Sequence, residues 1–186
     1  VGVPDGDTAI NVCNGLQAFL PIMLALSCSS PFFKGQNTGF SSYRTKLFEV
    51  LPLAGMYEGF TDWEDFSSTV IQLQKQGVIG SMRDLWWDVR PNPGFGTIEL
   101  RVCDLPTSFT AILGIVAFIQ AIVAEMVQTK KIYPKINRQV YQANKWQACR
   151  HGLFGRYVDP FEKNRPSVSI GEMVQETLKM VRPMSI

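Results

Sequence analysis

The sequence predicts an α+β fold in which helices surround one short hairpin. Helical patterns with cap residues occupy both ends of the chain, and a single strand–turn–strand pattern lies between them at residues 86–103. A chain of 186 residues is long enough to bury one core. Two strands are not a stable sheet by themselves, so the hairpin must pack on the helices or pair with strands outside this chain.

The N-terminal part of the chain is predicted to be helical with one interruption. Residues 9–27 form a long, mostly apolar stretch, and Asp7 or Thr8 just before it is a suitable N-cap. Pro21 should kink or divide this helix, because proline lacks the N–H that a helix interior needs. Residues 28–40 then have the composition of an irregular loop.

The next helix carries the first candidate binding residue. Ser41 or Ser42 can cap a helix that runs to about Leu51 and has Arg44 in its first turn. A helix N-terminus offers free N–H groups and a positive dipole end, which suit an anion. The alternative is that Arg44 pairs with a surface acid, which is the commoner use of such exposed residues.

Four more helices are predicted, at about 62–77, 107–129, 136–151 and 170–181. The first of them has Asp62 as a plausible N-cap and Gly77 just past its end. In the third, Asn144, Ala148 and His151 are spaced to share one face.

The helix at 107–129 is the most apolar segment of the chain. Its residues 109–127 approach the roughly 20 apolar residues that a bilayer needs, although Gln120 and Glu125 interrupt them. A helix that is apolar on every side is more often buried in the core of a soluble protein. We therefore expect a core helix rather than a membrane span.

Composition excludes several classes of function. A net charge of +2 with scattered Lys and Arg predicts neither a nucleic-acid partner nor an anionic membrane. Four widely spaced cysteines and one histidine, His151, do not form a structural zinc pattern. Free cysteines are typical of a reducing compartment, so a cytoplasmic location is the simplest expectation.

The hairpin carries the most informative side chains. Glu99 and Arg101 are two apart on one strand and therefore share a face, which Arg90 on the neighbouring strand could join. A carboxylate can bind Mg²⁺ beside a phosphate, and arginine makes forked contacts with phosphate oxygens. The alternative is a cross-strand salt bridge on a solvated face, which is common in sheets.

Other enzyme templates are poorly supported. The sequence contains no GxxxxGK[ST], GxGxxG or GxSxG motif. Cys149 and His151 are two apart on a predicted helix and so would not face each other as a nucleophile and its base.

Three long motifs resemble segments of one family. They occur in the family's order and together extend over most of this chain. They are LALSCSSPFFKGQNTGFSSYRTKLFEVLPLAG (24–55), DVRPNPGFGTIELRVCDLPTS (88–108) and NKWQACRHGLFGRYVDP (144–160). They are similar to segments of the carboxylate–amine ligase family related to the second type of glutamate–cysteine ligase. The resemblance implies that residues 1–186 are the C-terminal part of a single, glutamine-synthetase-like α+β catalytic domain, with an antiparallel sheet whose N-terminal strands are missing here.

The same resemblance implies a reaction and its site. ATP and Mg²⁺ would convert a carboxylate, typically the γ-carboxylate of glutamate, to an acyl phosphate, and an amine such as cysteine would then form the amide of glutathione biosynthesis. Carried over by motif, the metal ligand is Glu99, the catalytic residues are Arg101 and Arg90, and the ATP- or substrate-binding residues are Arg44, Asn144, Arg150 and His151.

The expected partners are therefore an amino acid and an amine, with neither nucleic acid nor membrane. The apolar helix and the Trp86–Trp87 pair would also allow a homodimer interface. One departure from the family pattern is Ser29, where an Asn is common, so that substrate preference could differ. The rival interpretation is a non-catalytic ligand-binding or regulatory module of the same fold.

Overall fold

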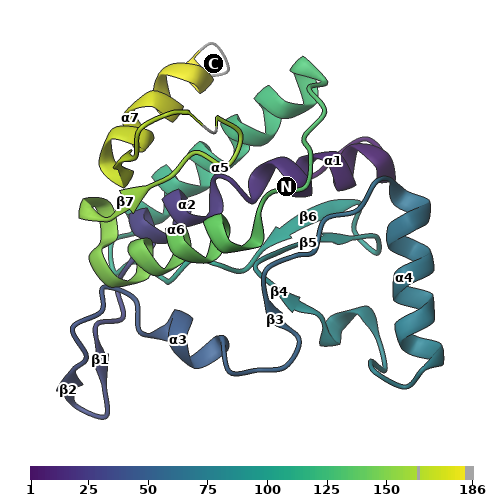
Figure 1. The fold of residues 1–186 in the computed structure, drawn as a ribbon, viewed down its shortest axis with the longest axis horizontal. Coiled ribbons are helices and arrows are strands. Elements are labelled where there is room, and N and C mark those ends of the chain that lie inside the picture. Colours follow the sequence, from purple (N-terminus) through teal and green to yellow (C-terminus); the bar gives the residue numbers. More distant parts are fainter. Residues whose placement is uncertain (163, 183–186) are drawn as a thin grey trace.

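The computed structural model describes residues 1–162 and 164–182, and it places helices around short strand pairs (Figure 1). The helices are α1 (Gly6–Leu16), α2 (Leu20–Ser27), α3 (Arg44–Phe48), α4 (Trp63–Lys75), α5 (Phe109–Thr129), α6 (Arg138–His151) and α7 (Ile170–Val181). The strands are β1 (Phe32–Phe33), β2 (Gln36–Asn37), β3 (Ala54–Gly55), β4 (Trp86–Trp87), β5 (Val89–Asn92), β6 (Thr97–Leu100), β7 (Arg156–Tyr157) and β8 (Val168–Ser169). The α+β class is confirmed.

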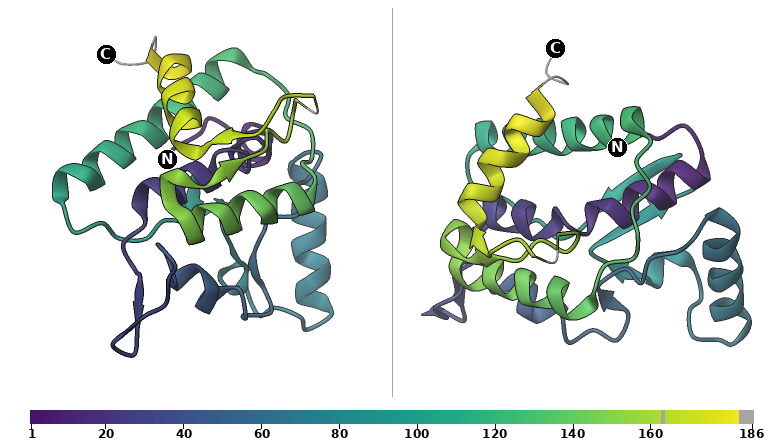
Figure 2. Two further views of the ribbon diagram at one scale, coloured as in Figure 1. Left: turned by 60° about the vertical axis from the view of Figure 1, so that its left-hand side comes forward. Right: turned by 45° about the horizontal axis from the view of Figure 1, so that its top comes forward.

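Helix α2 lies at the centre of the helical layer. It packs against α5, α6 and α7, while α1 packs against the β5–β6 hairpin and α4 (Figure 2). Almost every residue of α2 is buried, including Leu20, Ile22, Met23 and Leu24. Because this sequence is apolar on all sides, it can fill the centre of the layer without exposing a hydrophobic face.

The predicted break near Pro21 is confirmed. Helices α1 and α2 meet at an angle of 65°, and Pro21 lies in the first turn of α2, where its missing N–H costs nothing. The expected N-cap was wrong: Asp5 caps α1, and its Oδ1 accepts a hydrogen bond from the Thr8 backbone N–H at 2.7 Å. Asp7 instead accepts a bond from the backbone N–H of Trp63, which ties α1 to the start of α4.

The hairpin packs on the helices, as the first of the two alternatives predicts. Strands β5 and β6 are antiparallel and lie against α1. The start of the chain adds to β6, because Val1 and Ile98 exchange backbone hydrogen bonds at 2.7 and 2.9 Å. The predicted first strand is divided at Asp88, and its first part, β4, pairs in parallel with β3.

The segment before the hairpin differs from its prediction in two respects. Residues 28–40 include the small β1–β2 hairpin. Helix α3 is only five residues long, and no side chain caps it. Ser42 instead donates to Asp104, whose carboxylate also accepts from the Ser29 N–H and the Ser30 hydroxyl. Asp104 therefore anchors this segment to the chain that leaves β6.

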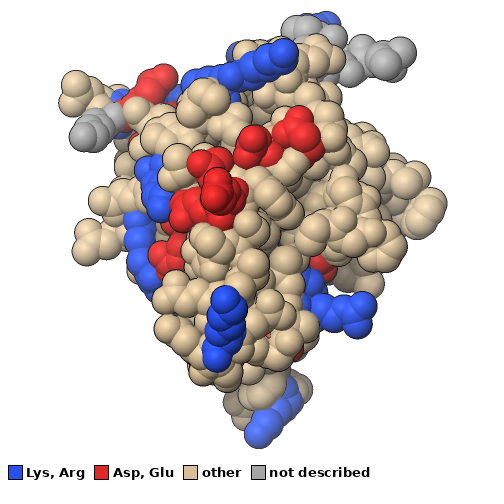
Figure 3. All heavy atoms as spheres, turned by 90° about the vertical axis from the view of Figure 1, so that its right-hand side faces the viewer, with Lys and Arg blue, Asp and Glu red and all other residues tan. Residues whose placement is uncertain are grey.

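Helix α4 has the predicted ends. Asp62 caps it through the Asp65 N–H, and Gly77 adopts the left-handed conformation just beyond it. Figure 3 shows acidic side chains gathered on the face that α4 lines, with basic side chains around its edges. Two helices begin there with acidic first turns, which stabilise the positive ends of the helix dipoles.

The expectation that α5 is a buried core helix was wrong for its first half. Only 22% of its most apolar 18-residue window is buried, and Phe109, Leu113 and Val116 are 73, 53 and 46% exposed. Burial is concentrated from the middle of the helix onward, at Phe118, Ile122, Val123 and Met126. By length and composition, α5 could cross a membrane, and the bent α1–α2 pair passes the same weak test among the described residues.

Candidate functional site

Glu99 joins two arginines, as the strand spacing predicts. Arg90 lies directly opposite Glu99 in the β5–β6 register. Its Nε and Nη2 atoms lie 3.0 Å from Glu99 Oε2, and the Nε of Arg101 lies 2.9 Å from Glu99 Oε1. The three side chains therefore form one cluster on one face of the hairpin.

The pKa of Glu99 is lowered by this cluster. Burial alone would raise it, but the hydrogen bonds and charges of Arg90 and Arg101 outweigh burial. A lowered folded-state pKa gives stability that is fully present above the ordinary value of 4.5 and is lost as the pH falls through the folded value.

The unfolding free energy of the protein should therefore fall below pH 4.5 more steeply than that of Glu99→Gln. Urea unfolding at a series of pH values on both sides of 4.5 measures the difference. Parallel curves for the two proteins throughout the acid range would contradict it.

The two arginines have different surroundings. Arg90 is buried, and its Nη1 also donates to the backbone carbonyls of Met82 and Leu85. Arg101 is more open, and its guanidinium lies over the indole of Trp86, 5.0 Å from the ring centroid. Arg90 is thus fixed by protein contacts, whereas Arg101 retains donors that a ligand can use.

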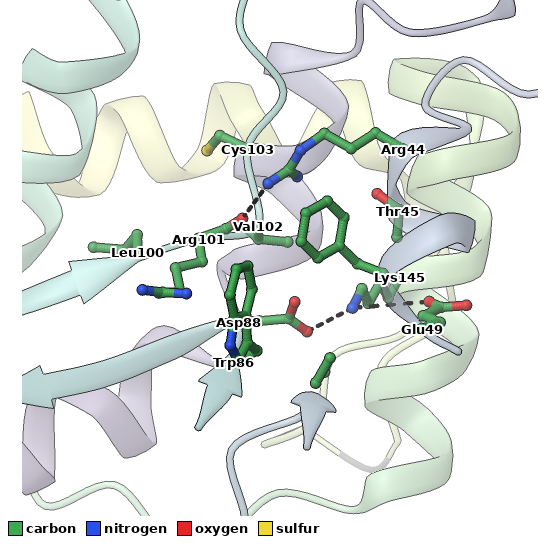
Figure 4. A pocket seen from close by; sticks show the side chains of 13 residues that line it. Arg44, Thr45, Glu49, Trp86, Asp88, Leu100, Arg101, Val102, Cys103 and Lys145 are labelled. Atoms are coloured by element: carbon green, nitrogen blue, oxygen red, sulfur yellow. Dashed lines mark hydrogen bonds and ion pairs between the residues drawn. The ribbon is translucent and has the colours of Figure 1, made fainter. Parts of the chain in front are cut away.

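Two cavities meet at Arg101 and Trp86, which line both. The open cavity, of about 680 Å³, contains the Glu99 cluster and Arg83. The inner cavity, of about 210 Å³, lies between α3, the hairpin and α6 (Figure 4). Cationic side chains therefore lie where the two cavities adjoin.

Arg44 lines the inner cavity and reaches the hairpin. Its Nη2 lies 3.4 Å from the carbonyl oxygen of Arg101, and its guanidinium lies over the Phe48 ring, 4.5 Å from the centroid. The rings of Phe48 and Trp86 are stacked with centroids 5.8 Å apart. Arg44 therefore faces the cavity, and within the described residues it forms no ion pair with an acidic side chain.

The opposite wall of the inner cavity carries a pair of charges that sequence reasoning missed. The Nζ of Lys145 lies 2.6 Å from Asp88 Oδ2 and 3.8 Å from a Glu49 carboxylate oxygen. The hydroxyl of Tyr141 donates to the same Oδ2 at 2.6 Å. Lys145 and Asp88 are 57 residues apart, and the only available signal was that each lies within a family motif.

Three predicted site residues on α6 lie outside both cavities. The Asn144 amide is held by the backbone N–H and carbonyl of Val158. Arg150 lies over the Phe40 ring and near the Thr38 carbonyl, and exposed His151 contacts Trp146 edge-on. Asn144 and His151 lie on one helix at the spacing of a shared face, but His151 is exposed at the end of the helix whereas Asn144 is buried.

The cysteines are free and poorly suited to nucleophilic chemistry. Burial raises the pKa of Cys149, whose Sγ donates to the Trp146 carbonyl. Burial likewise raises the pKa of Cys28 to about 12. A thiolate is therefore disfavoured at neutral pH at both positions.

The described residues do not supply a complete donor set for a metal ion. No group of three or more His, Cys, Asp or Glu side chains that could hold a metal occurs within residues 1–162 and 164–182. Mg²⁺ is often bound by one or two carboxylates together with phosphate oxygens and water. Glu99 fits the role of one such carboxylate, and the surrounding arginines fit the phosphate oxygens.

The model of glutamate–cysteine ligase family 2 matches residues 1–183. The chain belongs to this family. A protein of Gloeobacter violaceus, provisionally named glutamate–cysteine ligase 2, is 42% identical over 166 residues, which are 86% of this chain and 44% of that protein.

Two further family members give the same result. Proteins with the same provisional name from Methylibium petroleiphilum and Azoarcus sp. are 42 and 36% identical over 166 and 187 residues. The matches cover 89 and 100% of this chain, but 45 and 49% of those proteins. The chain therefore spans about half the length of the curated relatives it matches.

Proposed function

We propose that the complete protein is an ATP-dependent carboxylate–amine ligase that works through an acyl phosphate. The observation that carries this proposal is the set of arginines where the two cavities adjoin, with Glu99 beside them. Transfer of a phosphoryl group requires its negative charge to be neutralised by a metal ion or guanidinium groups. Family membership supports the same reaction class.

The residues divide between the two cavities. In the open cavity, Arg101 would hold a phosphate of ATP, and Glu99 would supply one carboxylate ligand to Mg²⁺. Arg90 would hold the Glu99 carboxylate in position through its ion pair with Glu99 Oε2. ATP would supply the phosphoryl group, and the inner cavity beside Arg44 would hold an organic substrate.

Glutamate and cysteine are the proposed substrates, because the relatives are named glutamate–cysteine ligase. Glutathione synthesis is the context that we propose for this reaction. Ser29 gives no reason to change them. Its hydroxyl donates to the Leu105 carbonyl at 2.9 Å, and its N–H donates to Asp104. Both contacts anchor the chain and leave the cavities untouched.

We further propose that the complete domain is glutamine-synthetase-like and that the rest of the protein extends this small sheet. We expect small-molecule substrates, no nucleic-acid or membrane partner, and action in the cytoplasm. The exposed half of α5 is where a homodimer contact would form. Cell fractionation of the complete protein tests the cytoplasmic location, and extraction only with detergent would contradict the absence of a membrane partner. Light scattering of the complete protein tests the homodimer.

The decisive experiment measures ADP release from Mg-ATP by the complete protein. Glutamate is supplied with a panel of amines that includes cysteine. ADP release that requires both glutamate and one amine is the expected result. No release with any pair, from a folded protein that binds nucleotide by calorimetry, would contradict the proposal and favour a non-catalytic module.

A further inference from the structure

Asp88 has one carboxylate oxygen that the protein leaves unused. Oδ2 accepts hydrogen bonds from Tyr141 and Lys145, both at 2.6 Å. Within the described part of the chain, Oδ1 has no hydrogen-bond partner, although Asp88 is only 8% exposed. Figure 4 shows the second oxygen directed into the inner cavity. Because Asp88 lines the cavity, this oxygen is accessible from it, and a charged ligand that donates there would gain a charge-assisted hydrogen bond.

The charges around this cavity are of both signs. Arg44 begins α3 and Arg101 directly follows β6. Asp88, between β4 and β5, and Glu49, at the C-terminal end of α3, lie near Lys145 of α6 (Figure 4). A ligand that carries a carboxylate and an ammonium group would match both sides. The cavity of about 210 Å³ is smaller than the usual 300–1,000 Å³ of drug-sized sites, which also favours a small ligand.

We propose that the inner cavity binds the amine substrate as an α-amino acid, and that Asp88 Oδ1 accepts a hydrogen bond and then a proton from its ammonium group. Arg44 binds the carboxylate of the same molecule. This inference rests on the proposed ligase function and assigns the second half-reaction to named residues. Asp88 is then a catalytic residue.

The proton must leave before the amide can form, because an ammonium nitrogen has no free electron pair. Asp88 takes one proton, and the nitrogen pair attacks the acyl carbon of the acyl phosphate. A C–N bond forms, the C–O bond to phosphate breaks, and phosphate departs with that electron pair. The remaining extra proton on nitrogen goes to the released phosphate, and the Asp88 proton goes to solvent.

Tyr141 and Lys145 act as positioning residues. Burial raises the pKa of Tyr141 well above its ordinary value, so the phenol stays protonated and donates to Asp88. With Oδ2 occupied by two donors, the carboxylate is fixed with Oδ1 toward the cavity. Tyr141 and Lys145 therefore orient the Asp88 carboxylate and leave its Oδ1 free for the substrate.

The test compares two nucleophiles in the full-length Asp88→Asn variant. Hydroxylamine is uncharged at neutral pH and traps an acyl phosphate without losing a proton first. Amide formation with the amine substrate should fall about 100-fold or more, with part of the loss recovered as the pH rises. Hydroxamate formation should fall far less than amide formation, because hydroxylamine does not need Asp88 to remove a proton. An equal fall with both nucleophiles, or no fall with either, would overturn the inference.

Two further variants keep the test decisive. Asp88→Asn leaves Lys145 buried without its main partner, so Asp88→Asn/Lys145→Gln removes both charges if the single variant fails to fold. Asp104→Asn is the matched control, because Asp104 is also buried but uses both oxygens on serine donors outside the cavity. Asp104→Asn should change the rates of amide formation and hydroxamate formation by the same factor.

If the wild-type protein makes no amide at all, the proposed function fails and binding alone decides the inference. Calorimetric titration would then compare the amino acid with its N-acetyl derivative, which has no ammonium group. Binding of the free amino acid only, and its loss in Asp88→Asn, would support the site. Equal binding to both proteins would overturn it.

Discussion

Glu99→Gln in the full-length protein is expected to remove ligase activity and leave the protein folded. Glutamine keeps the shape of the side chain but not the charge that would ligate Mg²⁺ beside a phosphate. The loss should be about 100- to 1,000-fold in kcat, the scale of one electrostatic contact to a transition state. ADP release with saturating substrates measures activity, and thermal unfolding measures the fold.

Glu58→Gln is the matched control for this variant. Glu58 pairs with Arg138 at 3.0 Å, but both side chains are 62% exposed, so its loss should change neither activity nor stability appreciably. Full turnover by Glu99→Gln would contradict the metal role. Loss of activity together with unfolding would show that the Glu99 cluster is only a structural salt bridge, which the sequence left open.

Local patterns predicted the positions of the long helices and of the hairpin, because their signals lie within a few residues of each element, but they overestimated the length of α3. The Asp62 cap and Gly77 bracket α4, and Pro21 marks the break before α2. The Glu99–Arg101 contact followed from strand alternation, which fixes the face of each side chain. The register of β5 and β6 then brought Arg90 opposite Glu99.

The missed features depend on contacts between distant segments. Lys145 becomes a site residue only because α6 packs beside the hairpin and brings it to Asp88. No helical periodicity can show that a lysine faces a buried carboxylate 57 residues earlier. Likewise, the apolar sequence of α5 predicts burial, but only its second half is covered by α1, α2 and α7.

The family resemblance named candidate site residues but did not show which of them line the cavities. Asn144, Arg150 and His151 belong to one motif, yet their side chains contact backbone, aromatic rings or solvent outside the two cavities. Lys145 in the same motif lines the inner cavity. A helix presents a new direction at every residue, so a motif on a helix mixes residues of the site with residues that support the fold.

Arg90→Met should destabilise the protein far more than Arg101→Met, although both arginines contact the same carboxylate. The side chain of Arg90 is 6% exposed and that of Arg101 is 25% exposed. Loss of Arg90 leaves the carbonyls of Met82 and Leu85 without this donor and removes a main partner of Glu99. We expect a loss of about 2–4 kcal/mol for Arg90→Met and about 1 kcal/mol or less for Arg101→Met.

Urea unfolding of the two variants measures this difference, and ADP release by the full-length variants separates structural from catalytic roles. Arg101→Met should lose activity while it keeps its stability, because Arg101 lines both cavities and retains donors for a ligand. Equal destabilisation by the two substitutions would mean that Arg101 is fixed by the fold as firmly as Arg90. Arg101 would then have no more free donors for a phosphate than Arg90 has, and the assignment of Arg101 to ATP binding would be contradicted.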